Sequence, residues 1–275
     1  MTGAGGMLGG EAVRQLHERG HDVVACDRRA LDITDAAQAS VVLAAARPDA
    51  VLHCAAFTNV DAAEADREQA FRVNVGGTSN VARAAYEAGA RFMYVSTDYV
   101  FDGESQEPYR PDAPTNPPGV YGRTKLEGER AALLAEDTLI ARTSWVYGKG
   151  GSNFPSRLLE LARAGERFRA IVDQRSVPTW VDDTADVMIR LLEQRAPAGI
   201  YHANSNGNAS WYEFACEAVV LAGLDVQVEP VRVHELRLPA ARPRYSVMDV
   251  GCTERLVGPV RSWSAALAAA VEGGL

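Results

Sequence analysis

The sequence predicts a doubly wound α/β fold, in which helices cover both faces of a parallel sheet. Two observations predict it. Short, continuously apolar runs alternate along the chain with stretches of helical periodicity. The apolar runs do not alternate with polar residues, which is typical of strands that are buried on both faces by helices. The succession of strand and helix then indicates the doubly wound arrangement.

Six short apolar runs are expected to form strands, and five stretches between them are expected to form helices. The expected strands are 21–27, 49–56, 91–96, 138–144, 168–174 and 199–204. The expected helices lie near 9–19, 35–46, 74–89, 119–135 and 182–195. The proline-rich segment 108–119 is expected to be a loop, because prolines at this density exclude a helix or a central strand. It either shapes the mouth of an active site or is a plain surface connection.

The last third of the chain is less regular, and Ser210 is expected to cap a helix there. We expect a dinucleotide-binding domain formed by residues 1–145 and about 168–205. Residues of about 146–167 and 206–275 are expected to form a smaller, partly helical substrate lobe.

Composition excludes several classes of protein. The net charge is −8, so no nucleic-acid surface is expected, since such a surface needs a basic stripe. The four cysteines form no CxxC pair and are expected to be free thiols in a reducing compartment. No apolar run reaches membrane-spanning length, and the N-terminus lacks a basic and then apolar leader. We expect a cytoplasmic protein without a nucleic-acid or membrane partner.

The first residues carry a glycine pattern that is typical of a phosphate-binding turn. Gly3, Gly6 and Gly9 are spaced three apart, and helical periodicity begins directly after them. Glycines allow the backbone to approach a pyrophosphate, and a helix N-terminus offers free N–H groups to it. Asp27 follows Gly9 by 18 residues, at the expected strand end where a carboxylate would bind the adenosine ribose. The stretch LDITD at 31–35, with Asp32 and Ile33, could meet the adenine.

The residues around Asp27 leave the choice of nicotinamide cofactor open. Asp27 favours NAD, because a 2′-phosphate would face a like charge. Arg28 and Arg29 beside it could accept that phosphate, which favours NADP. We expect a slight preference for NADPH, with use of NADH retained as an alternative.

Tyr121 and Lys125 form the most informative pair in the sequence. They are four residues apart at the start of an expected helix, so their side chains share one face. Only Lys125 and Lys149 are lysines, in a chain that otherwise uses arginine. A compact ammonium at this place could bind the nicotinamide ribose and lower the pKa of the phenol, which would help it to act as an acid. Upstream, Ser96, Thr97 and Asp98 follow an expected strand, where ligands bind in such folds.

Together these motifs resemble the extended short-chain dehydrogenase/reductases, and within them the dTDP-4-dehydrorhamnose reductase family. The resemblance is carried by TGAGGMLG, LDITD, RPDAVLHCAAFTNVDAAE, VNVGGTSNVA, STDYVFDG, VYGRTKLEGE, ARTSWVYGKGGSNF, DQRSVPT, SWYEFA and RPRYSVMD. These stretches run in the order of the family and cover nearly the whole chain. STDYVFDG, YGRTKLEGE and RTSWVYG are the most specific of them.

The resemblance implies roles for individual residues. Thr97, Tyr121 and Lys125 would be the catalytic group, with Thr97 orienting the carbonyl and Tyr121 donating a proton. Asp98, Tyr99 and Trp145 would surround the sugar, and Arg242 would reach its diphosphate. The cofactor, NADPH or NADH, would contact Tyr121 and Lys125 together with Gly3, Gly6, Met7, Leu8, Asp27, Arg28, Asp32, Ile33, Ala55, Ala56 and Thr58.

The resemblance implies reduction of the C4 ketone of a dTDP-4-keto-6-deoxy sugar, first of all dTDP-4-dehydrorhamnose to dTDP-L-rhamnose. Reduction of another dTDP-4-keto sugar is an alternative. A second alternative is a non-catalytic subunit that resembles the regulatory subunit of methionine adenosyltransferase. The family also allows a homodimer and a divalent metal at its contact, whose ligands we cannot assign. Two stretches depart from the family: Ser176 replaces a common glycine, and HCAA at 53–56 replaces Asn-Ala-Ala.

The chain begins on the glycine turn, and the resemblance implies that a strand comes before it. That strand is central in the doubly wound order. Without it, its neighbours would leave buried N–H and C=O groups unpaired, each at a cost of about 1–3 kcal/mol. We therefore expect the first strand to be missing from this chain. Our hypothesis is that a valine codon inside this strand was read as the start codon. If the protein instead begins at Met1, we expect its cofactor binding to be weak.

Overall fold

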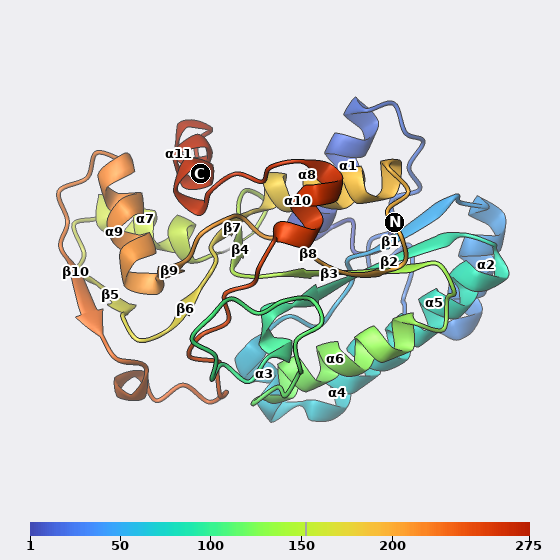
Figure 1. Ribbon diagram of the computed structural model, residues 1–275, viewed down its shortest axis with the longest axis horizontal. Coiled ribbons are helices and arrows are strands. Elements are labelled where there is room, and N and C mark those ends of the chain that lie inside the picture. Colours follow the sequence, from blue (N-terminus) through green and yellow to red (C-terminus); the bar gives the residue numbers. More distant parts are fainter. Residues whose placement is uncertain (152) are drawn as a thin grey trace.

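A computed structural model describes residues 1–151 and 153–275 of the chain (Figure 1). Its centre is a four-stranded parallel sheet in the order β1-β2-β3-β8. The strands are β1 (Ala50–His53), β2 (Arg91–Thr97), β3 (Thr138–Thr143) and β8 (Gly199–His202). They confirm four of the six expected strands and the α/β class, with helices on both faces of the sheet.

Apolar side chains on both faces explain why these runs form a parallel sheet. Val51, Phe92 and Ile140 belong to one core, and their chain neighbours Leu52, Met93 and Leu139 belong to the other. Successive residues of a strand point to opposite faces, so a continuous apolar run fills both cores.

Helices cover the two faces as two groups (Figure 1). On one face lie α1 (Met7–Glu18), α8 (Val181–Glu193) and α10 (Gly251–Val257). On the other lie α2 (Ala36–Ala46), α5 (Thr78–Glu87) and α6 (Val120–Ala132). The shorter turns are α3 (Val60–Ala65), α4 (Arg67–Phe71), the π-helical η1 (Arg72–Gly77) and the 3₁₀ turn η2 (Asp98–Val100). All five expected helices are present.

A second region lies at one end of the central sheet, on the left of Figure 1. It contains α7 (Phe154–Arg163), α9 (Trp211–Leu221), α11 (Trp263–Glu272), and the paired strands β5 (Phe168–Ile171) and β10 (Val228–Val231). Short pairs β4 (Val146–Tyr147) with β7 (Thr179–Trp180) and β6 (Arg175–Ser176) with β9 (Ala209–Ser210) connect it to the sheet, and η3 (Val233–Leu236) follows β10.

Two details of this second region bear on the sequence analysis. Ser210 caps α9 as expected, by accepting the N–H of Glu213, whose carboxylate accepts the N–H of Ser210 in return. The run at 168–174 does form a strand, but outside the central sheet. Its partner β10 lies far along the chain, and a short apolar run does not encode which strand it will pair with.

The position before the glycine turn holds Met1 and Thr2. Thr2 bridges in parallel to both Cys26 and His53, so it lies between the segment around Cys26 and β1. The expected strand at 21–27 is wrong: the segment makes a single bridge, at Cys26. Met1 and Thr2 pair with this segment through Val24 and Cys26 without forming a ladder, and Val24 is 52% exposed.

Three smaller expectations can be followed in the structure. Residues 108–119 form no helix, and Tyr109 bridges to Met248 while the Pro111 carbonyl accepts a bond from Arg142. All four cysteines are free thiols. Within the described part of the chain, no helix is long and apolar enough to cross a membrane.

Candidate functional site

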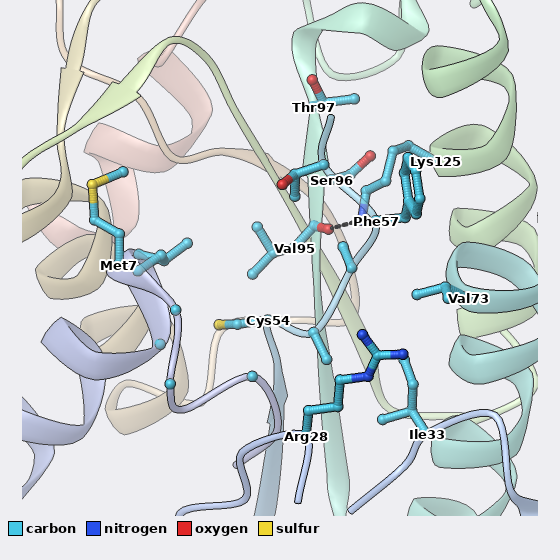
Figure 2. A pocket seen from close by; sticks show the side chains of 18 of the residues that line it. Met7, Arg28, Ile33, Cys54, Phe57, Val73, Val95, Ser96, Thr97 and Lys125 are labelled. Carbon is cyan, nitrogen blue, oxygen red and sulfur yellow. Dashed lines mark hydrogen bonds between the residues drawn. The ribbon is translucent and has the colours of Figure 1, made fainter. Parts of the chain in front are cut away.

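A cavity of about 900 Å³ opens at the carboxyl ends of β1, β2 and β3. The glycine turn, the loop after Cys26, the loop after β1, the end of β2 and the first turns of α6 all line it (Figure 2). Every residue expected to contact the cofactor lies in this lining: Gly3, Gly6, Met7, Leu8, Asp27, Arg28, Asp32, Ile33, Ala55, Ala56, Thr58, Tyr121 and Lys125. The structure also places Thr97 and Trp145 there.

The glycine turn is shaped by close backbone contacts. Gly3 has a φ of +72°, and a Cβ on it would lie 2.6 Å from the backbone nitrogen of Ala55. A Cβ on Gly9 would lie 2.0 Å from the carbonyl oxygen of Gly3. Gly6 precedes α1, which has no side-chain cap and no acidic residue in its first turn. The free N–H groups at this helix end therefore fit an anionic phosphate.

The loop after Cys26 carries both signs of charge into the cavity. The Asp27 carboxylate accepts the N–H groups of Arg29 and Ala30, each at 2.9 Å. These bonds lower the pKa of Asp27 and hold it as a carboxylate. Arg28 extends along the cavity near Ile33 (Figure 2). Arg72, from η1, lines the same end. A carboxylate for ribose hydroxyls and guanidiniums for a phosphate are thus both present.

Asn74 is a structural residue of the site that sequence reasoning missed. It is 1% exposed, and its side chain bonds to both the N–H and the carbonyl of Phe57, at 2.7 and 3.0 Å. It also donates to Thr124 Oγ1 at 2.8 Å. Asn74 thereby joins the loop after β1 to the helix that carries Lys125. The π-helical turn around it, which is uncommon outside functional sites, was visible in the sequence only as the motif VNVGG.

Tyr121 and Lys125 both face the cavity from α6, opposite the end of β2. The Lys125 Nζ donates to the Val95 carbonyl at 2.7 Å (Figure 2) and lies 4.1 Å from the centre of the Tyr94 ring. Burial lowers the pKa of Lys125 to about 7, although Glu129, one helical turn further on, acts to raise it.

The expected lowering of the phenol pKa by Lys125 is not found. Burial raises the pKa of Tyr121 to about 12, a hydrogen bond with Thr97 acts to lower it, and the charge of Asp98 acts to raise it. The physical reason is that the Lys125 ammonium is turned to the Val95 carbonyl. Tyr121 is therefore a protonated phenol at neutral pH, which is the form that can donate a proton.

Asp98 and Tyr99 are not among the residues that line this cavity, and their expected contact with a sugar stays a prediction. Asp98 is 1% exposed, and its carboxylate accepts the hydroxyls of Thr97, Ser176 and Ser246. The Tyr99 ring stands edge-on against Tyr121, with ring centres 5.7 Å apart. Both residues follow Thr97 in η2 (Asp98–Val100).

Trp145 lines the cavity and is held in an unusual conformation. Its φ is +41°, in the left-handed region that non-glycine residues rarely adopt. The Trp211 ring stacks on it with the centres 3.6 Å apart and the planes 13° apart. Its carbonyl accepts the N–H of Thr179. Stacking and this bond together hold the indole at the edge of the cavity.

Arg242 lies at a second cavity, of about 700 Å³, together with Arg157, Asn59, Asp61 and Phe154. Its guanidinium donates to Asp61 Oδ2 at 2.8 Å and to the Ala240 carbonyl at 2.9 Å. It also lies near the Tyr99 phenol, whose pKa it acts to lower against the opposing effect of burial. Arg242 thus lies near the Tyr99 phenol and lines the second cavity.

No metal ligands were assigned from the sequence. Within residues 1–151 and 153–275, no three His, Cys, Asp or Glu side chains gather in a way that could hold a metal ion.

Comparisons with known proteins agree with this architecture. A sequence profile described as "RmlD substrate binding domain" matches residues 1–274. A dTDP-4-dehydrorhamnose reductase of Streptomyces griseus is 43% identical, over 97% of this chain and 90% of that protein. A dTDP-4-keto-6-deoxy-D-glucose reductase of Streptomyces niveus is 39% identical, over 97% of this chain and 94% of that protein.

The fold is shared with solved structures. The dTDP-4-dehydrorhamnose reductase of Bacillus anthracis, crystallised in complex with NADP, superposes with a TM-score of 0.95 at 36% identity. The match covers 99% of this chain and 97% of that one. Profile, sequence relatives and fold agree over nearly the full length, so the chain belongs to the dTDP-4-dehydrorhamnose reductase family of extended short-chain dehydrogenase/reductases.

Proposed function

We propose that this protein reduces the C4 ketone of a dTDP-4-keto-6-deoxy sugar with a nicotinamide cofactor. The observation that carries the proposal is the placement of Tyr121 and Lys125 on one face of α6, with Thr97 and Trp145 lining the same cavity as the glycine turn. Reductases that act on two different dTDP-4-keto sugars are among its relatives. We take dTDP-4-dehydrorhamnose as the substrate and dTDP-L-rhamnose as the product.

The cavity fits a dinucleotide. The uncapped N-terminus of α1 and the glycines that admit close backbone approach suit the pyrophosphate. When bound, the reduced nicotinamide supplies the hydride for the ketone carbon. Tyr121, protonated at neutral pH, donates its proton to the ketone oxygen, and Lys125 binds the ribose beside it. Thr97 lines the same cavity and acts to lower the pKa of the Tyr121 phenol.

The cofactor is NADPH in preference to NADH. One carboxylate oxygen of Asp27 already accepts two backbone N–H groups. Arg28 and Arg72 line the cavity at the same end and can pair with a 2′-phosphate. The remaining Asp27 oxygen can still accept ribose hydroxyls, so NADH is used as well, more weakly.

The second cavity supports a place for the nucleotide end of the substrate. Arg157 and Arg242 supply guanidiniums there, and Phe154 and Phe168 supply aromatic rings that can pack on a base. Trp145 lines the first cavity, and its ring stacks on Trp211, which in turn packs against Phe154 of the second cavity. The lobe around α7, α9 and β5 would therefore hold the substrate.

The test is a turnover assay with the purified full chain, NADPH and dTDP-4-dehydrorhamnose, following the absorbance of the reduced nicotinamide. We expect NADPH oxidation that depends on the sugar, and formation of dTDP-L-rhamnose identified by mass spectrometry and NMR. Binding of NADPH without oxidation by any dTDP-4-keto sugar would contradict a reductase and favour the non-catalytic subunit. Oxidation with another keto sugar alone would correct only the substrate.

A further inference from the structure

The short helix α3 carries two acidic residues that the proposed reaction does not yet use. Asp61 and Glu64 belong to the stretch RPDAVLHCAAFTNVDAAE, and at three residues apart they share one side of the helix. Both carboxylates bond to groups that lie far away in the chain. Glu64 bonds to the start of α6, and Asp61 bonds to the segment 240–242. These two parts of the molecule carry Tyr121 and Arg242.

Glu64 caps α6 from outside that helix. Its Oε1 accepts the N–H of Val120, the first residue of α6, at 2.7 Å. Gly119, at the N-cap position, has no side chain that could accept a bond from this helix end. The neighbouring Ala63 is fully buried and belongs to one apolar cluster with Val120, against which Tyr121 packs. Glu64 and Ala63 thus hold the helical turn that presents the phenol.

Asp61 holds the segment that carries Arg242. Its Oδ1 accepts the N–H of Ala240 at 3.1 Å, and its Oδ2 accepts the Arg242 guanidinium at 2.8 Å. The bond from Arg242 lowers the pKa of Asp61, which is therefore a carboxylate at neutral pH. Asp61 and Arg242 both line the second cavity. The carboxylate thus fixes the direction in which the guanidinium enters that cavity.

The two bonded segments meet at Gly119. A Cβ on this residue would lie 3.0 Å from the Ala241 carbonyl oxygen and 3.2 Å from Glu64 Oε1. Its φ of −113° is open to any residue, so the missing side chain serves close packing here and not backbone freedom. Helix α3, the segment 240–242 and the start of α6 therefore form one packed junction.

We propose that α3 fixes the separation between the proton donor and the guanidinium of the second cavity, with Glu64 as a positioning residue for Tyr121 and Asp61 as a positioning residue for Arg242. The proposal rests on the function proposed above, in which Tyr121 protonates the ketone and Arg242 faces the nucleotide end. One substrate molecule has to meet both groups at once. An error of about 1 Å in the position of a reacting group is enough to lower an enzymatic rate strongly.

The first test compares Glu64→Ala with Glu64→Gln in steady-state kinetics. Glutamine keeps an oxygen that can accept the Val120 N–H, whereas alanine removes it. Glu64→Ala is expected to lower kcat about tenfold or more, with the KM for NADPH within about threefold of wild type. Glu64→Gln is expected to restore kcat to within about threefold of wild type. An unchanged kcat in Glu64→Ala, or an equal loss in both variants, would overturn the positioning role.

Glu254 provides a matched control for the first test. Its Oε1 accepts the N–H of Val260 at 3.1 Å, a bond of the same kind between a helix and a separate segment. Neither residue is among those that line the two cavities. Glu254→Ala is expected to keep kcat. A loss of kcat as large as in Glu64→Ala would assign both losses to general destabilisation and contradict the proposal.

The second test follows the same bond without turnover. Hydrogen–deuterium exchange at residues 120–124 is expected to be faster in Glu64→Ala than in the wild type and in Glu64→Gln. Glu64→Asp, which keeps the charge on a side chain one methylene shorter, replaces Glu64→Ala if that variant fails to fold, with the same expected results. Wild-type exchange would overturn the proposal. Faster exchange in a protein whose wild type turns over no dTDP-4-keto sugar would overturn the proposed function alone.

The third test separates the two ends of α3. Asp61→Asn keeps an oxygen for the Ala240 N–H and removes the charge that holds the guanidinium. The KM for the sugar nucleotide is expected to rise about threefold to tenfold at nearly constant kcat, the reverse of the pattern for Glu64. Asp66→Asn, which alters a carboxylate bonded to the Gln69 N–H at the start of α4, is the control and should leave both constants unchanged. A wild-type KM in Asp61→Asn would show that Asp61 does not position Arg242.

Discussion

The two sides of the site are built in different ways. On the cofactor side, contiguous segments follow one another in chain order, and backbone approaches set the shape, as where Gly3 and Gly9 pack against neighbouring main chain. On the side that our proposal assigns to the substrate, distant side chains meet: Asp98 with Ser176 and Ser246, and Trp145 with Trp211. The cofactor side is therefore encoded in short motifs, whereas the substrate side depends on tertiary contacts that no local pattern contains.

Tyr121 stands between the two sides, and its removal should have the largest effect. Tyr121→Phe takes away the proton donor while keeping the ring that packs against Tyr99. We expect kcat to fall by roughly 10²–10⁴-fold, the usual contribution of a general acid, with NADPH affinity within about threefold of wild type. Stopped-flow turnover and fluorescence titration of NADPH measure the two quantities. Tyr86→Phe, an exposed tyrosine on α5, is the control. An equal loss in NADPH binding would show that Tyr121 shapes the cofactor side instead.

A buried histidine beside the glycine turn makes the stability of the cofactor side depend on pH. His53 is 1% exposed and bonded to Thr2 and Thr78, and burial lowers its pKa to about 3. The unfolded chain binds the proton near pH 6.5, so stability from this site is present above that pH and is lost as pH falls toward 3. The loss approaches about 4 kcal/mol at the acid end.

Denaturant unfolding from about pH 7 to about pH 4 would measure this loss in the wild type and in His53→Gln. The glutamine keeps hydrogen-bonding groups and does not titrate, so its stability should change less over this range. The Asp98 contribution has the opposite sign, because its pKa is raised on folding. Parallel curves for wild type and His53→Gln would mean that His53 does not govern the acid response.

The backbone packing of the glycine turn can be tested with two neighbouring glycines. Gly9→Ala places a methyl group 2.0 Å from the Gly3 carbonyl oxygen, so the turn or α1 must shift. Overpacking of this kind lowers folding stability by about 1–3 kcal/mol. We also expect NADPH affinity to fall about tenfold or more, which calorimetric titration would measure. Gly10→Ala meets its nearest atom at 3.5 Å and should be neutral or gain up to about 1 kcal/mol. If Gly9→Ala and Gly10→Ala have similar stability and NADPH affinity, close backbone packing at Gly9 does not shape the glycine turn.

The same contrast explains what sequence reasoning could reach. Helical spacing placed Tyr121 and Lys125 on one face of α6, and the strand pattern placed Thr97 at the end of β2, because both depend on local periodicity. Asp98 and Tyr99 were expected beside the sugar, and that expectation stays a prediction; both follow Thr97 in the η2 turn. The partner of β5 and the serines around Asp98 were missed, since their contacts join residues far apart in the chain.

Substitution of Arg28 has the smallest expected effect, and it distinguishes binding of NADPH from binding of NADH. Its guanidinium extends along the cavity (Figure 2) and can pair with a 2′-phosphate, a group that NADH lacks. Arg28→Ala is therefore expected to raise the KM for NADPH by about tenfold, equivalent to about 1.4 kcal/mol, and to leave the KM for NADH within about twofold. Steady-state kinetics with both cofactors measure the difference, and NADH serves as the internal control. Equal effects on both would mean that Arg28 only shapes the loop after Cys26, and that Arg72 or Arg29 provides what preference there is for the phosphate.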